Sequence, residues 1–154
     1  MEADVRLLTV PFDALAEIDG FAAANDDAGG IASFIGKVRP SGGVEALELS
    51  HYEPLTLPGM QGLANEIVGR WQVTGLMIVH RTGVMLPGDA IVLVVAAAKH
   101  RRDAIEAVDF AMDHLKSDSW FWKREKRADG WHWIEPREQD HSDLARWSEK
   151  TPAI

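Results

Sequence analysis

Basic residues that could bind an anion or move a proton concentrate in residues 100–125. A predicted helix starts at His100-Arg101 and ends at Lys116, and the chain continues into Lys123-Arg124-Glu125. The unpaired N–H groups of a helix start, together with basic side chains, suit a phosphate. A lysine with cationic neighbours can act as a nucleophile or a proton carrier. The alternative for both groups is a basic surface in water.

The helix itself keeps its two basic ends apart. A rise of about 1.5 Å per residue places Arg101 and Lys116 on the order of 23 Å from each other. One small-molecule pocket cannot hold both. Either the two ends are unrelated, or a second copy of the chain brings its helix start beside the Lys116 end and forms a composite site. We favour the composite site.

Residues 120–125 are expected to be extended, so their side chains alternate between two faces. Phe121, Lys123 and Glu125 share one face, while Trp120 and Trp122 share the other. We expect both tryptophans to face the core. The lysine then lies beside the glutamate, whose carboxylate can orient its ammonium group.

Outside residues 100–125 the sequence offers few candidate site residues. Arg39 ends a predicted strand before a Pro-Ser-Gly-Gly turn, where a guanidinium can reach an anion and a flexible turn admits a ligand. The six histidines have no spacing typical of metal ligands, and no glycine pair has the pattern of a nucleotide loop. We predict neither a metal site nor a bound cofactor.

Composition limits the classes of protein. The 154 residues are 46% hydrophobic and 26% charged, which predicts one globular domain over 1–154. The absence of cysteine excludes a sulfur nucleophile of the chain's own. A net charge of −8 disfavours nucleic acid. The longest apolar run, residues 91–98, is too short to cross a bilayer, and no signal-peptide pattern is present, so we expect the cytoplasm.

Hydrophobic periodicity predicts an α+β fold with a largely antiparallel or mixed sheet. Leu15, in the helix that follows residues 11–13, and Ile105, in the last helix, are expected in the core. We expect residues 91–98 to be a central buried strand and the strands at 31–39 and 44–52 to pair as a hairpin. The other predicted strands are 5–10, 76–81, 120–125 and 131–135, and the other helices are 60–71 and 101–116, whose core stripe includes Val108, Met112 and Leu115.

Seven short motifs, in order along the chain, resemble one family. They are Phe34-Ile35-Gly36-Lys37-Val38-Arg39, Leu49-Ser50-His51-Tyr52, His80-Arg81-Thr82-Gly83, Pro87-Gly88-Asp89, Lys99-His100-Arg101, Leu115-Lys116 and Phe121-Trp122-Lys123-Arg124-Glu125. Together they resemble the catalytic large subunit of molybdopterin synthase, the MoaE family. No single motif among them would suffice.

The resemblance implies a fold of the α/β-hammerhead type with an additional small antiparallel β subdomain. It also implies a homodimer with a small ubiquitin-like sulfur-carrier subunit at each outer end. The carrier's C-terminal Gly-Gly thiocarboxylate would deliver two sulfurs to cyclic pyranopterin monophosphate and form the dithiolene of molybdopterin. The lack of cysteine agrees with this, because the partner would supply the sulfur.

The resemblance also assigns roles to individual residues. Lys116 would be the principal catalytic lysine and Lys123 the second. The substrate-binding residues would be Lys37, Val38, Arg39, Arg124 and Glu125, with His100 and Arg101 from the neighbouring subunit; Met112 and Arg137 are lesser candidates. The resemblance puts Phe34 near the pocket together with Arg39, although the two point to opposite faces of a regular strand. A bulge at Gly36 would resolve this.

Two alternatives remain at this point. The chain could be an inactive scaffold for the carrier. It could also be a module that grips single-stranded nucleic acid with its aromatic and basic residues 120–127.

Overall fold

Two four-stranded sheets and four helices make up the residues that the computed structural model describes, 1–40, 42–117, 120–135 and 138–149. In chain order the elements are β1 (Asp4–Leu8), α1 (Ala14–Ala24), β2 (Gly30–Lys37), β3 (Ala46–His51), α2 (Glu53–Arg70), β4 (Val73–Arg81), β5 (Gly83–Met85), β6 (Ala90–Ala98), α3 (Arg101–Ser117), β7 (Phe121–Arg127), β8 (Gly130–Ile134) and α4 (Glu138–Glu149). The predicted α+β class is confirmed.

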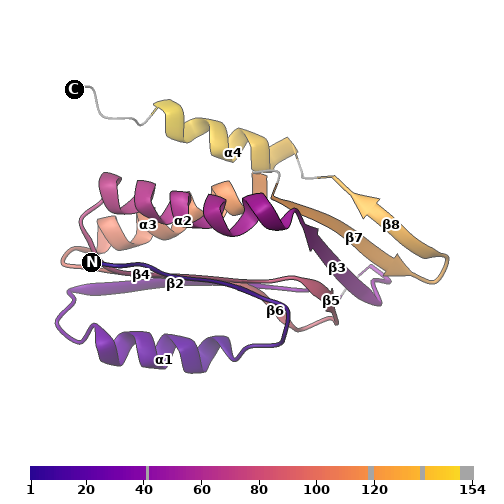
Figure 1. Cartoon of the computed structure of the whole chain (residues 1–154), viewed down its shortest axis with the longest axis horizontal. Coiled ribbons are helices and arrows are strands. Elements are labelled where there is room, and N and C mark those ends of the chain that lie inside the picture. The colour runs from indigo at the N-terminus through magenta and orange to yellow at the C-terminus, as the bar shows by residue number, and fades with distance from the viewer. Residues whose placement is uncertain (41, 118–119, 136–137, 150–154) are drawn as a thin grey trace.

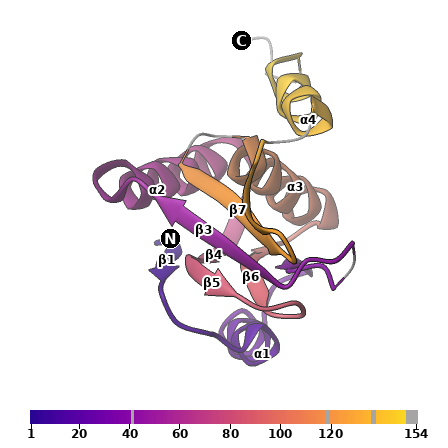
Figure 2. The ribbon, with the colours of Figure 1, turned by 90° about the vertical axis from the view of Figure 1, so that its right-hand side faces the viewer.

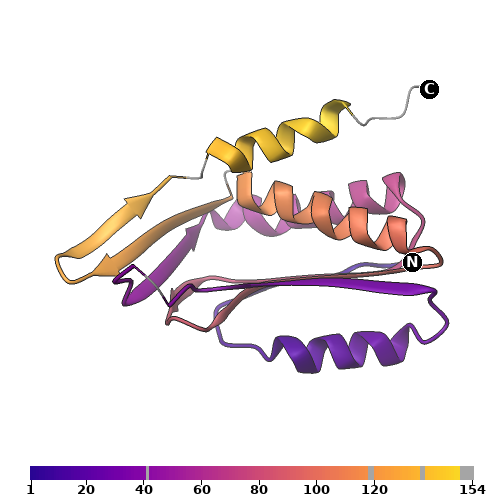
Figure 3. The ribbon, with the colours of Figure 1, turned by 180° about the vertical axis from the view of Figure 1, so that it is seen from behind.

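The larger sheet is mixed and lies between two layers of helices. Its strand order is β1-β4-β6-β2, with β1 parallel to β4 and the other neighbours antiparallel. Figure 1 shows α1 against one face and α2 and α3 against the other, and the reverse view in Figure 3 agrees. Because both faces of β6 are covered, its residues 91–98 are all buried, which confirms the predicted central strand.

Small side chains bring α3 close to the larger sheet. Ala104, Ala107 and Ala111 are at most 1% exposed, in line with the buried Leu115 near the helix end. The expectation that Ile105 belongs to this stripe is wrong, because it is 55% exposed. The same holds for Leu15 of α1, at 71%. Helical spacing alone did not fix which neighbouring position faces the sheet.

The smaller sheet is antiparallel throughout, with strand order β5-β3-β7-β8. Figure 2 shows β3 and β7 side by side. The predicted hairpin between residues 31–39 and 44–52 is therefore wrong. The first segment, β2, pairs with β6 instead, and the second, β3, pairs with β5 and β7. Gly42 and Gly43, both with φ above +70°, lead the chain out of one sheet and into the other.

Three elements differ from the expectation or were not predicted. α2 begins at Glu53, where a link into a helix over 60–71 was expected. Pro54 fits in the first turn because no hydrogen bond needs its missing N–H there, and Pro58 is tolerated inside the helix. The short β5 and the terminal α4 were not predicted; α4 packs on α3 through Trp147, which is 3% exposed.

Candidate active site

A cavity of about 850 Å³ opens between the two sheets at the carboxyl end of α3. Its lining comes mainly from the end of β2, the last turns of α3, and β7, which are far apart in the sequence. Apolar residues of both sheets form much of its inner wall. The sequence-predicted residues that line it are Lys37, Val38, Arg39, Met112, Lys116, Lys123 and Glu125.

A β-bulge sets the direction of the residues at the end of β2. The register against β6 shifts between Gly36 and Lys37, which confirms the predicted bulge. Val38 is then buried, and its backbone N–H and C=O bond to the turn at 88–89 at 3.0 and 2.8 Å. These bonds hold Lys37 and Arg39 at the cavity. Phe34, in contrast, is 42% exposed and lies outside the lining, so the bulge does not bring it to the pocket.

The carboxyl end of α3 presents Lys116 at the cavity. Leu115 and Met112 anchor this last turn in the core, at 6% and 9% exposure. The hydroxyl of Ser117 donates a hydrogen bond to the Asp140 carbonyl at 2.7 Å and ties the helix end to α4. The lysine therefore extends from a fixed helix end.

Alternation along β7 places most of the cavity-lining residues of this strand on one face, although Trp122 also borders the cavity. Phe121, Lys123 and Glu125 line the cavity, as the sequence predicted for one shared face. The tryptophan prediction is wrong for Trp122, which is 48% exposed, because no helix covers the outer face of this sheet. Trp120 does pack against the core.

Arg124 lies on that outer face and not in the cavity. Its guanidinium bonds to Glu48 at 2.6 Å and stacks over the Trp131 ring, whose centroid is 4.5 Å away, with Trp133 at 5.7 Å. The structure therefore gives Arg124 a local ion pair and aromatic contacts, whereas the family resemblance implied that it binds substrate.

His100 and Arg101 are exposed at the opposite end of α3 from Lys116. Neither residue lines the cavity. Since α3 runs straight from Arg101 to Ser117, the separation of about 23 Å expected for a continuous helix holds within one copy of the chain. Arg137, which the resemblance gave as a lesser candidate together with Met112, lies outside the described residues.

The cavity lining also includes His80 and Arg127, which were given no role in the site from the sequence. His80 of β4 is 5% exposed, and burial, with smaller contributions from the charges of Lys116 and His51, lowers its pKa to about 4. Arg127 pairs with Glu125 at 2.9 Å and also donates a hydrogen bond to the Gly42 carbonyl. The His80-Arg81-Thr82-Gly83 motif could have indicated His80, but no sequence feature indicated Arg127 as a cavity residue.

Neither a metal cluster nor a membrane span is found in the part of the chain that the structure describes. No three His, Asp or Glu side chains gather there in a way that could hold a metal ion. No helix among the described elements has the length and apolar character to cross a membrane.

Comparison with known proteins gives a consistent result. A family model described as MoaE protein matches residues 9–118. The molybdopterin synthase catalytic subunit of Caulobacter vibrioides is 42% identical over 147 residues, covering 95% of this chain and 98% of the relative. The solved molybdopterin biosynthesis MoaE protein from Burkholderia ambifaria has a TM-score of 0.79 at 41% identity, covering 95% of this chain and 98% of that one.

A more distant structure shares the fold alone. It is the complex of subunits 1 and 2 of the molybdopterin-converting factor from Helicobacter pylori, with a TM-score of 0.74 at 20% identity, covering 86% of this chain and 91% of that chain.

The α+β fold with a basic cavity between its two sheets, the family match and the near-complete coverage of relatives define the class: the chain belongs to the MoaE family. The expected resemblance is confirmed. Its function is that of the catalytic subunits of molybdopterin synthase, enzymes that transfer sulfur in molybdopterin formation.

Proposed function

We propose that this cavity transfers sulfur from the C-terminal thiocarboxylate of a small ubiquitin-like carrier to cyclic pyranopterin monophosphate. In each transfer the thiocarboxylate sulfur forms a bond to a carbon of the pterin side chain while a carbon–oxygen bond of that side chain breaks. Water then cleaves the bond between sulfur and the carrier's acyl carbon, and its oxygen leaves the carrier as a carboxylate. The observation that carries the proposal is the meeting of Lys116 and Lys123, from different elements, at one cavity.

Lys116 and Lys123 are proposed as the catalytic groups. An ammonium group beside the thiocarboxylate can stabilise the negative charge that develops on the acyl oxygen, and the neutral amine can accept a proton. Glu125 is the carboxylate on the same face of β7 as Lys123, which lets it orient that lysine. Two lysines in one cavity allow one to be charged while the other is neutral.

Lys37 and Arg39 are proposed to bind the anionic part of the substrate. Both line the cavity, and the buried Val38 between them holds the strand end in place. A guanidinium suits a phosphate because its N–H groups can bind two oxygens at once. His100 and Arg101 would add their charge from the neighbouring copy in a dimer. Arg124 is not part of this proposal, because Glu48 and Trp131 already engage its guanidinium.

The carrier is proposed to insert its extended Gly-Gly tail into the cavity. Apolar side chains of both sheets line the cavity, including Leu47 and Ile91, and glycine residues pass where larger side chains would not. The proposed assembly is a dimer of this chain with one carrier on each copy. The cytoplasmic location expected from the sequence stays a prediction.

The test is a reconstituted assay with thiocarboxylated carrier and cyclic pyranopterin monophosphate, measuring dithiolene product. Lys116→Ala should fold and form no product, and Lys123→Ala should be strongly impaired. Lys126→Ala is the matched control, because Lys126 is on the same strand but exposed on the outer face. Wild-type protein that binds the carrier and forms no product would support the scaffold alternative instead.

A further inference from the structure

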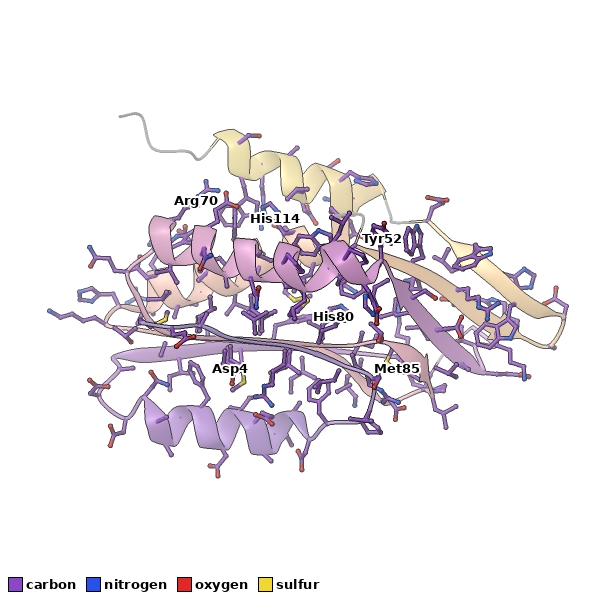
Figure 4. All side chains as sticks on the ribbon, viewed as in Figure 1. Asp4, Tyr52, Arg70, His80, Met85 and His114 are labelled. Carbon is purple, nitrogen blue, oxygen red and sulfur yellow. The ribbon has the colours of Figure 1, made fainter. Side chains whose placement is uncertain are left out.

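His80 is a buried base at the cavity to which the proposed mechanism gives no part. It lies near the end of β4, and Figure 4 shows it in the interior, between the larger sheet and the helices above it. Its ring stacks on Phe121, with centroids 3.9 Å apart and planes 14° from parallel. Because Phe121 opens β7, this stack joins the larger sheet to the strand that carries Lys123.

One hydrogen bond determines which nitrogen of His80 carries its proton. Nδ1 lies 3.0 Å from the Arg81 carbonyl oxygen, which can only accept a hydrogen bond. Nδ1 must therefore carry the hydrogen. In the neutral ring Nε2 then has a free lone pair, at the end of the imidazole farther from the backbone.

The surroundings of His80 keep its ring neutral. Burial is the largest effect on its pKa, and the charges of Lys116, from α3, and His51, from β3, lower it further. His51 lies opposite Phe121 in the β3–β7 pairing, and its Nδ1 is buried without a hydrogen-bond partner among the described residues. Lysine has a higher intrinsic pKa than histidine, so in a contact between the two the proton belongs on Lys116.

We propose that His80 is a positioning residue for Lys116, whose ammonium group donates a hydrogen bond to the lone pair on Nε2 of the neutral imidazole. This rests on the proposed role of Lys116. An ammonium has three N–H donors, so a contact with His80 leaves two for the substrate and other partners. The stacked ring of Phe121 and the Arg81 carbonyl keep the imidazole from turning away.

The position of a catalytic group affects the rate more than it affects substrate binding. A displacement of about 1 Å can reduce a rate on the order of 100-fold. Loss of the His80 acceptor is therefore expected to lower kcat while the KM for the pterin changes little, because Lys37 and Arg39 would bind that substrate's phosphate elsewhere in the cavity.

The test compares two substitutions that separate hydrogen bonding from packing. His80→Phe keeps an aromatic ring on Phe121 and removes the acceptor, whereas His80→Gln keeps an acceptor at similar reach and loses the ring. We expect His80→Phe to lower kcat at least about tenfold and His80→Gln to recover most of it. A structural role predicts the reverse order, and that result, or equal activity of both variants and wild type, would overturn the inference.

A second measurement does not depend on activity. In protein with ¹³C- and ¹⁵N-labelled lysine, the signal of Lys116, assigned with Lys116→Arg, should titrate at lower pH in His80→Phe than in wild type. The reason is that the ammonium loses an acceptor. The signal of Lys123, which shares the cavity, is recorded alongside as the internal reference.

A third measurement tests the same contact without the His80→Phe substitution, in case that variant does not fold. In the otherwise native chain, Lys116→Ala should move the ¹⁵N resonance of His80 Nε2 toward that of a free lone pair. An unmoved resonance would overturn the inference. If these signals shift as expected but wild type forms no product, the contact stands and the proposed function fails.

Discussion

The separation of the two basic ends of α3 leads to a test of where the active site lies. Arg101 is about 23 Å from Lys116 along the helix, and Lys116 lines the cavity whereas Arg101 does not. If both act on one substrate, they must come from different copies of the chain. Arg101→Ala and Lys116→Ala should each abolish activity as homodimers.

A mixed dimer of these two variants should regain activity. One of its two sites then takes an intact Lys116 from one copy and an intact Arg101 from the other, while the second site carries both defects. Mixed dimers purified through two different tags should thus show about half of the wild-type activity per dimer. The assay is dithiolene formation with thiocarboxylated carrier.

A second mixture serves as the control. Lys116 and Lys123 line the same cavity of one copy, so a dimer of Lys116→Ala with Lys123→Ala has one defect in each site and should not exceed the low activity of the Lys123→Ala dimer. Recovery in this control would show that the two lysines do not share a site. No recovery in the first mixture, with dimers proven to be mixed, would refute the composite site.

The remaining predictions concern stability, each measured as the free energy of unfolding in urea by circular dichroism. Gly29→Ala should lower it by about 1–3 kcal/mol, because the new Cβ would lie 1.9 Å from a main-chain carbonyl oxygen. Gly62→Ala, in exposed helix without a described atom within 4 Å of the new Cβ, should raise it by about 0.5–1 kcal/mol. Trp147→Ala should cost about 3–5 kcal/mol and the 65%-exposed Trp133→Ala about 0.5 kcal/mol or less. Burial lowers the folded-state pKa of His80 from 6.5 to about 4, so between these two pH values the unfolded chain binds a proton that the folded chain does not. The free energy of unfolding should therefore fall as the pH is lowered from 6.5 to 4, by on the order of 3 kcal/mol.

Each of these expectations has a result that contradicts it. A neutral Gly29→Ala would mean that the loop beside α3 shifts without cost. Equal losses for the two tryptophan variants would contradict the packing of α4 on α3. A His80→Phe protein that keeps the full pH dependence of wild type between pH 6.5 and 4 would show that another group titrates in that window.

The sequence by itself identified the local features of this protein. A run of eight apolar residues predicted the buried strand β6, because only a strand covered on both faces tolerates such a run. The two-residue period of strands placed Phe121, Lys123 and Glu125 on one face. These inferences depend only on neighbours along the chain.

Tertiary structure alone decided which segments meet. The pairing of β2 with β6, and of β3 with β7, separated two strands that are adjacent in sequence, because the buried β6 needs a hydrogen-bonded neighbour along each of its edges. The same choice left the outer face of β7 uncovered, so Trp122 stays 48% exposed and Arg124 lies outside the cavity lining. It also buried His80 beside the end of α3. Local periodicity gives the faces of a strand, but only the whole fold determines which face is covered.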